Sequence, residues 1–126
     1  MPRTRRAPDK QSSRKRAEKA GRRAEILCAL FLRLKGYRIL ATRYKSPVGE
    51  IDIIARRGKV LIGVEVKNRP DRDTALYALR PDQQNRIART LAAYAGRIGH
   101  HGDMRFDLMI VRGIRVEHLS NAWHVS

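Results

Sequence analysis

The sequence predicts a three-layer α/β/α sandwich with a central mixed sheet. Segments with helical and strand periodicity follow one another in the order helix, three strands, helix, then one or two strands. The chain has 126 residues, enough for one domain with one modest core. Its hydrophobic fraction of 42% is ordinary for a soluble protein, and no apolar run reaches the roughly 20 residues of a membrane span.

Residues 1–13, MPRTRRAPDKQSS, are predicted to form a disordered basic tail, because they offer almost nothing to bury. The tail either follows a phosphate backbone electrostatically or is dispensable. The domain then spans residues 14–126 and begins with a helix from about Arg14 to Lys35, which ends before Gly36. The expected core stripe of this helix contains Ala20, Ala24, Leu27, Leu30, Phe31 and Leu34.

A strand is expected from Tyr37 to Tyr44, and a loop then leads into a β-hairpin. The hairpin strands are residues 50–55 and residues 60–67, and Gly58 supplies the permissive backbone of the tight turn between them. Because side chains alternate between the faces of a strand, one face of the hairpin is wholly apolar. The residues of this face, which we expect to be buried, are Ile51, Ile53, Ala55, Ile62, Val64 and Val66.

The opposite face of the hairpin carries charged side chains. Either two-residue turn places Asp52, Glu65 and Lys67 together, whereas a one-residue slip would send the carboxylates to the other side. Burying such charges is costly unless something compensates them. Mg²⁺ would do so, because it prefers oxygen ligands and is commonly held by one or two carboxylates plus substrate phosphates. Solvated charges at a strand edge, or a degenerate site, are the alternative.

These residues resemble a known nuclease signature. Asp52, twelve intervening residues and then Glu65-Val66-Lys67 resemble the PD-(D/E)xK motif, although Ile51 replaces the proline that some members have before the aspartate. The pattern GEIDIIA…VEVKNR is similar to the YraN family of small bacterial endonuclease-like proteins, from about Gly21 to Trp123. The resemblance implies a restriction-endonuclease-like core and metal-dependent hydrolysis of phosphodiester bonds, with structured DNA favoured as substrate.

The resemblance also implies roles for the hairpin residues. Asp52 and Glu65, with the carbonyl of Val66, would hold Mg²⁺ or Mn²⁺, and Glu25 and Glu50 would assist directly or through water. Lys67 would position and help to deprotonate the attacking water, or stabilise the charge that develops on the phosphate.

Glu25 matches a first-helix glutamate that approaches the metal in the resembled proteins. On a helical wheel it lies nearly opposite the expected core stripe, flanked by Cys28, Ala29 and Leu32. The alternative is a surface residue that pairs with Arg22 at helical spacing.

A second helix is expected from about Asp82 to Tyr94 or Ala95, since Pro81 suits a first turn. The resembled nucleases often place a Gln or Lys near the catalytic groups here. Gln83 is the matching residue, and the adjacent Gln84 leaves the register open by one. A surface amide at the start of a helix is the alternative. The expected buried stripe is Ile87, Leu91 and Tyr94.

The C-terminal part is predicted to add one strand over residues 105–111 and an edge strand over residues 114–119. Asp107 in the first of these strands has no assigned role. Trp123 is expected to cover the core rather than to stack on a base. The neighbouring His100 and His101 lack further partners at ligand spacing and are not expected to bind a metal.

Charge is the strongest compositional feature. The chain has 28 Lys and Arg against 12 Asp and Glu, a formal net charge of +16, which predicts affinity for nucleic acid with little sequence preference. A basic surface that only keeps the protein soluble is the alternative. Membrane binding is not expected, because no basic amphipathic helix with large exposed apolar groups is evident. Cys28 is the only cysteine and no secretory segment is recognisable, so a cytoplasmic protein is predicted.

Two function hypotheses follow. The first is a metal-dependent endonuclease, with DNA favoured over RNA by the resemblance alone, and with a homodimer suggested by analogy to junction resolvases. The second is a non-catalytic DNA- or RNA-binding accessory protein with a vestigial nuclease site. The intact set of Asp52, Glu65 and Lys67 favours the first, since a vestigial site is expected to have lost at least one of them.

Overall fold

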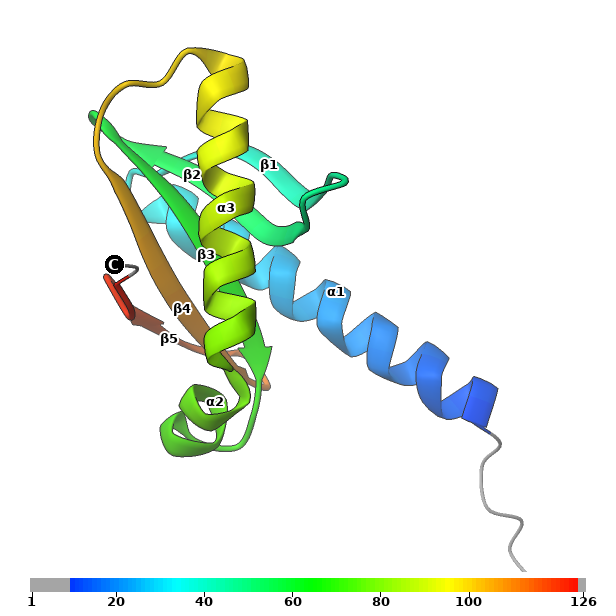
Figure 1. Cartoon of the computed structure of the whole chain (residues 1–126). Helices are drawn as coiled ribbons and strands as arrows, with labels where there is room; N and C mark the ends of the chain where they lie inside the picture. The colour runs from blue at the N-terminus through cyan, green and yellow to red at the C-terminus, as the bar shows by residue number, and fades with distance from the viewer. Residues whose placement is uncertain (1–9, 125–126) are drawn as a thin grey trace, which may run out of the picture.

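The computed structural model describes residues 10–124 and shows a five-stranded mixed sheet with helices on both sides (Figure 1). The elements in chain order are α1 (Lys10–Leu34), β1 (Arg38–Lys45), β2 (Glu50–Arg57), β3 (Val60–Asn68), α2 (Arg72–Ala78), α3 (Pro81–Ile98), β4 (Met104–Arg112) and β5 (Arg115–Leu119). The strand order is β1-β2-β3-β4-β5, in which only β3 and β4 are parallel. The predicted α/β/α sandwich is confirmed. None of the helices among residues 10–124 is long and apolar enough to cross a bilayer.

The β2–β3 hairpin forms in the predicted register. Arg57 pairs with Val60 across a two-residue turn, and Gly58 has a φ of 59°, a left-handed conformation that favours glycine. Four of the six expected apolar residues, Ile53, Ala55, Ile62 and Val64, are fully buried on the α1 side of the sheet. Val66 is half-buried on the same side.

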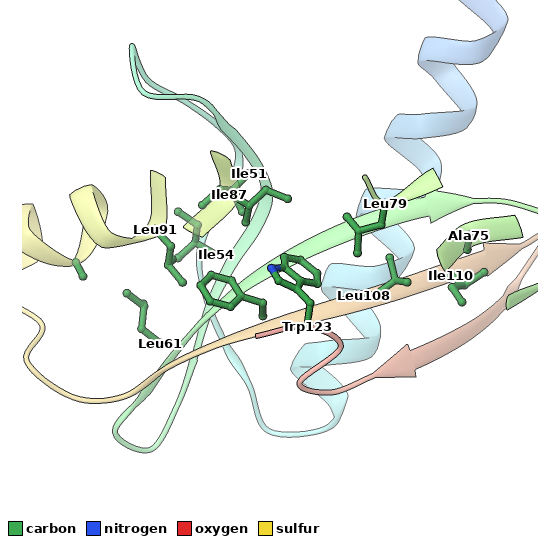
Figure 2. Close-up of a cluster of buried hydrophobic side chains, with 12 residues drawn as sticks. Ile51, Ile54, Leu61, Ala75, Leu79, Ile87, Leu91, Leu108, Ile110 and Trp123 are labelled. Atoms are coloured by element: carbon green, nitrogen blue, oxygen red, sulfur yellow. The ribbon is translucent and has the colours of Figure 1, made fainter. Parts of the chain in front are cut away.

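Ile51 was expected on this face, and that prediction is wrong. It is buried in the cluster on the other side of the sheet, near Ile87 of α3 (Figure 2). The pairing of β2 with β3 stops at Ile53 opposite Val64. Because the start of β2 is not held flat against β3, Ile51 can turn towards α3.

The predicted core stripe of α1 is confirmed in part, because the buried face is rotated about the helix axis. Ala24 is buried, and Leu27 and Phe31 are partly buried against the same core cluster, as predicted. Leu30 and Leu34 are 51% and 80% exposed, whereas the buried residues are Ala24, Cys28, Ala29 and Leu32. Three of these four side chains are small, which lets the helix backbone approach the sheet closely. In addition, α1 begins at Lys10, so residues 10–13 of the predicted tail are helical; the rest of that tail lies outside the described residues.

The second predicted helix corresponds to α3, which runs longer than expected, through Gly96 to a left-handed Gly99 with a φ of 70°. Ile87 and Leu91 are fully buried as predicted, and Tyr94 is half-buried. The short helix α2 was not predicted. It is capped by the Asp71 side chain, which accepts a hydrogen bond from the Thr74 N–H at 2.7 Å.

Trp123 covers the core on the α3 side, as predicted. Its ring stacks on Phe106, with 5.4 Å between ring centroids and 18° between ring planes, and it lies among the buried side chains of Figure 2. The segment after β5 therefore closes this layer rather than presenting an aromatic surface.

Asp107 has a structural role that the sequence did not reveal. It is fully buried, and its oxygens accept hydrogen bonds from the guanidinium of Arg105 at 2.8 and 2.9 Å, from His118 at 2.7 Å and from the Asn121 N–H at 2.9 Å. Burial alone would raise the pKa of Asp107, but the hydrogen bonds from His118 and Arg105 outweigh it and hold that pKa below its usual range. This carboxylate ties β4 to β5 and to the segment that carries Trp123.

Replacing Asp107 with Ala should therefore lower the free energy of unfolding by about 3 kcal/mol, because Arg105 and His118 would lose their buried anionic partner. Urea denaturation at neutral pH measures this loss. Asp103→Ala, which removes an exposed carboxylate just before β4, is the control and should change little. Equal stability of the two variants would contradict the structural role.

Candidate functional site

The candidate site lies where β2 separates from β3. One residue beyond the last paired position, the Asp52 Oδ2 accepts a hydrogen bond from the Val66 N–H at 2.8 Å. In a continued ladder this N–H would have paired with the backbone of Ile51. Because the N–H and C=O of a strand residue point to the same side, the Val66 carbonyl faces the same gap. An aspartate side chain and a backbone carbonyl that has no ladder partner in β2 are thereby brought together.

A second carboxyl group, from Glu65, meets Asp52 in this gap. The Glu65 side chain is only 9% exposed, and its carboxyl group forms a hydrogen bond with that of Asp52. Burial, this hydrogen bond and the charge of Asp52 raise the pKa of Glu65 well above its ordinary value of 4.5, while Lys67 opposes the shift. Two carboxyl groups in one poorly solvated gap form a place where a cation would be strongly stabilised.

Lys67 and Gln83 lie on the α3 side of the site. The Lys67 Nζ is 4.0 Å from Glu65 Oε1 and donates a hydrogen bond to Gln83 Oε1 at 3.4 Å. Gln84 instead donates to the Leu79 carbonyl at 3.1 Å, in the connection between α2 and α3. Of the two neighbouring glutamines, Gln83 is therefore the one that contacts the candidate catalytic lysine.

Glu25 reaches the site from α1. The rotation of α1 described above places it next to the buried side of the helix, with a side chain that is 18% exposed. Burial and the charge of Asp52 raise the pKa of Glu25, while Arg43 and Arg22 lower it. Its ion pair is with Arg43, at 3.6 Å, instead of the alternative partner Arg22.

A hollow of about 120 Å³ opens beside these groups. Its lining includes the carboxylates of Glu25, Glu50 and Asp52 and the cations Arg43 and Lys45. Both signs of charge therefore face one small space, an arrangement that suits a divalent cation together with phosphate oxygens. Glu50 is exposed at the rim of this hollow.

A metal ion at this site would have few protein ligands. Within residues 10–124, no three or more His, Cys, Asp or Glu side chains form a ready metal-binding group, so Glu25 does not complete a three-carboxylate cluster. The donors in reach of one another are Asp52, Glu65 and the Val66 carbonyl. All are oxygens, and they leave positions for water and phosphate, as Mg²⁺ or Mn²⁺ requires. The donor set thus fits the expected metal.

Arg43 is the site residue that sequence reasoning missed. It lies in β1 with a φ of 52°, an uncommon conformation for a residue other than glycine, just after a register shift between Ile39 and Ala41. This backbone geometry accompanies the approach of its side chain to Glu25. Nothing in the local sequence RILATRYK distinguishes this arginine from its neighbours.

The raised pKa of Glu65 predicts that the free energy of unfolding of the metal-free protein depends on pH. The native structure favours the protonated form of Glu65, so its contribution to stability is fully present below pH 4.5 and is lost as pH rises towards the native pKa. Glu65→Gln, which stays neutral, should therefore be more stable than wild type at pH 8, by on the order of 2 kcal/mol, and equally stable at pH 4.

Chemical denaturation in EDTA across this pH range measures the difference. Glu18→Gln, on an exposed part of α1, is the matched control. A stability difference for Glu65→Gln that does not change with pH would contradict the carboxyl pair.

Comparisons with known proteins identify the family. A family model described as "Uncharacterised protein family UPF0102" matches residues 24–111, a range that contains Glu25, Asp52, Glu65, Lys67 and Gln83. A UPF0102 protein of Parvibaculum lavamentivorans is 48% identical over 110 residues, covering 85% of this chain and 83% of the relative. One from Caulobacter vibrioides is 44% identical over 117 residues, covering 90% and 94%. A third, from Rhodopseudomonas palustris, is 46% identical over 113 residues, covering 87% and 86%. The chain therefore belongs to the UPF0102 family, the same family as the YraN proteins that its motifs resemble.

Proposed function

We propose that this protein is a metal-dependent endonuclease that hydrolyses phosphodiester bonds in nucleic acid, with structured DNA as the favoured substrate. The observation that carries the proposal is the pairing of the buried Glu65 carboxyl group with that of half-buried Asp52, with Lys67 beside them. A structural ion pair would need one carboxylate for one lysine. The second carboxyl group has no lysine of its own to pair with at this site, so it lowers the stability of the folded protein until a cation is bound.

Asp52, Glu65 and the Val66 carbonyl would hold Mg²⁺ or Mn²⁺, and Glu25 would take part through water. When bound there, the metal lowers the pKa of a water molecule and neutralises charge on the phosphate. The hydrogen bond from the Val66 N–H fixes one oxygen of Asp52 and leaves the other available to a ligand.

Lys67 would act on the attacking water or on the charge that develops on the phosphate. Its side chain is 13% exposed, so its ammonium group acts in a partly desolvated position where electrostatic interactions are strong. Gln83 carries no charge, and its amide oxygen holds the Lys67 Nζ without neutralising it. Gln83 is therefore a positioning residue in this proposal.

Binding of the substrate would rest on the basic surface. The net charge of +16 favours any polyphosphate through counterion release, and Arg43 and Lys45 bring part of that charge to the hollow beside Asp52. DNA is favoured over RNA only by the family resemblance. The proposal includes a cytoplasmic location, which the free thiol of Cys28 supports. It also includes a homodimer that acts on two strands.

Cleavage of end-labelled substrates in Mg²⁺ or Mn²⁺ at low salt tests the proposal. The panel contains a single strand, a duplex, a flap, a four-way junction and RNA. Asp52→Ala and Lys67→Ala should each lose at least about 100-fold in cleavage rate while binding persists. Lys59→Ala, which removes an exposed lysine from the β2–β3 turn, is the matched control and should cleave like wild type.

The outcomes separate the hypotheses. Cleavage of one substrate by wild type and Lys59→Ala alone would support the enzyme and define its substrate class. Undiminished cleavage by a clean Asp52→Ala preparation would contradict the assignment. Tight, salt-sensitive binding without cleavage by any variant would favour the non-catalytic accessory protein.

A further inference from the structure

A second depression adjoins the candidate site, between the β1–β2 loop and α3. We call it the loop groove; its volume is about 430 Å³, and its lining includes Pro47, Val48, Gly49, Glu50, Gln83 and Arg86. Two of these residues connect it with the site. Glu50 also lines the hollow beside Asp52, and Gln83 accepts the hydrogen bond from Lys67. A chain lying across the site can therefore continue into the loop groove.

The wall of the loop groove depends on a close approach at Gly49. A Cβ atom at this position would lie 2.7 Å from Thr90 Oγ1 and 2.8 Å from Arg86 Cγ, so only glycine fits without displacement. The loop itself is held by the Ser46 hydroxyl, which accepts hydrogen bonds from the Val48 and Gly49 N–H groups at 3.2 and 3.3 Å. The stem of Arg86 is thus packed against a fixed loop.

The chemistry of the loop groove suits a sugar-phosphate chain. Arg86 is exposed, and within residues 10–124 it has no carboxylate at ion-pair distance. The side chains of Pro47 and Val48 give the opposite wall apolar surface, and Val48 is 43% exposed. Among residues 10–124 no aromatic side chain lines the groove, so this part of the chain offers no platform there for stacking a base. An unpaired guanidinium beside apolar surface matches a phosphate followed by a sugar.

We propose that the loop groove binds the nucleic-acid backbone next to the bond to be cut, and that Arg86 positions the neighbouring phosphate. Gln83 and Arg86 are three residues apart, so they lie on one face of α3 with about 5–6 Å between their Cβ atoms. Gln83 contacts Lys67, and the reacting phosphate is taken to lie beside Lys67. Arg86, one helical turn from Gln83, therefore contacts a phosphate one or two positions along the strand from the reacting one. This inference rests on the proposed function, because it takes the reacting phosphate to lie beside Lys67.

Binding of a fluorescent DNA strand in EDTA, where no cleavage occurs, tests the inference independently of activity. Arg86→Ala should weaken binding about 5-fold and lower the slope of log affinity against log salt by about 0.7, the value per phosphate contact for a single strand. Arg89→Ala is the matched control, since it removes the same charge from an exposed position of α3 outside the loop groove. Equal losses in the two variants would show an effect of net charge alone and would overturn the inference.

A set of strands with one neutral methylphosphonate each, moved along the chain, locates the contact. Wild type and Arg89→Ala should lose affinity most at one position, and Arg86→Ala should no longer distinguish that position. Arg86→Lys keeps the charge and the packed stem, so it should retain the sensitivity. If a methylphosphonate at every position, including the most sensitive one, weakens binding of Arg86→Ala as much as it weakens binding of wild type, the inference is overturned. If those binding results hold but the enzyme assay shows no cleavage, the proposed function fails and the groove stands.

Discussion

The hydrogen bond from the Val66 N–H to the Asp52 side chain is the interaction on which the candidate site depends. It satisfies a backbone donor at the point where the β2–β3 ladder ends, so the two strands can separate without leaving that donor unpaired. The separation leaves Val66 without a ladder partner in β2, brings the Asp52 carboxyl group to that of Glu65 and turns Ile51 towards α3. The site is therefore a local interruption of the sheet, stabilised by one of its own candidate ligands.

The two helix layers complete this interruption from opposite sides. From α1, small buried residues such as Ala24 and Cys28 allow the close packing that brings Glu25 near Asp52. From α3, Gln83 reaches Lys67 and Arg86 packs against Gly49. Asp107 lies away from these contacts and ties β4 to β5, so the chain uses one buried carboxylate for stability and a pair of carboxyl groups at the candidate site.

The parts of the fold that could be predicted from sequence are those set by local pattern. The hairpin register follows from the alternation of Ile and Val and from a turn glycine, and the grouping of Asp52, Glu65 and Lys67 follows from that register. The buried face of α1 could not be predicted by the same reasoning, because a wheel weights large residues such as Leu34, whereas packing on the sheet favoured small ones.

Features that depend on distant contacts left no local signal. The position of Arg43 depends on the backbone of an edge strand and on Glu25 in another element. The role of Asp107 depends on His118 and Asn121, which follow it by 11 and 14 positions. The separation of β2 from β3 before Ile53 likewise leaves no sign in a sequence that continues to alternate. Local periodicity predicts which residues share a face, but not where a face is interrupted.

The most direct test of the central claim is calorimetric titration of Mn²⁺ into the metal-free protein at pH 7, in two buffers with different ionisation enthalpies. Because the raised pKa of Glu65 favours its protonated form in the metal-free protein, binding should release up to about one proton per ion, and Asp52→Asn should bind far more weakly. Absence of binding at low salt, or equal binding by Asp52→Asn, would contradict the claim that these carboxyl groups form a metal site.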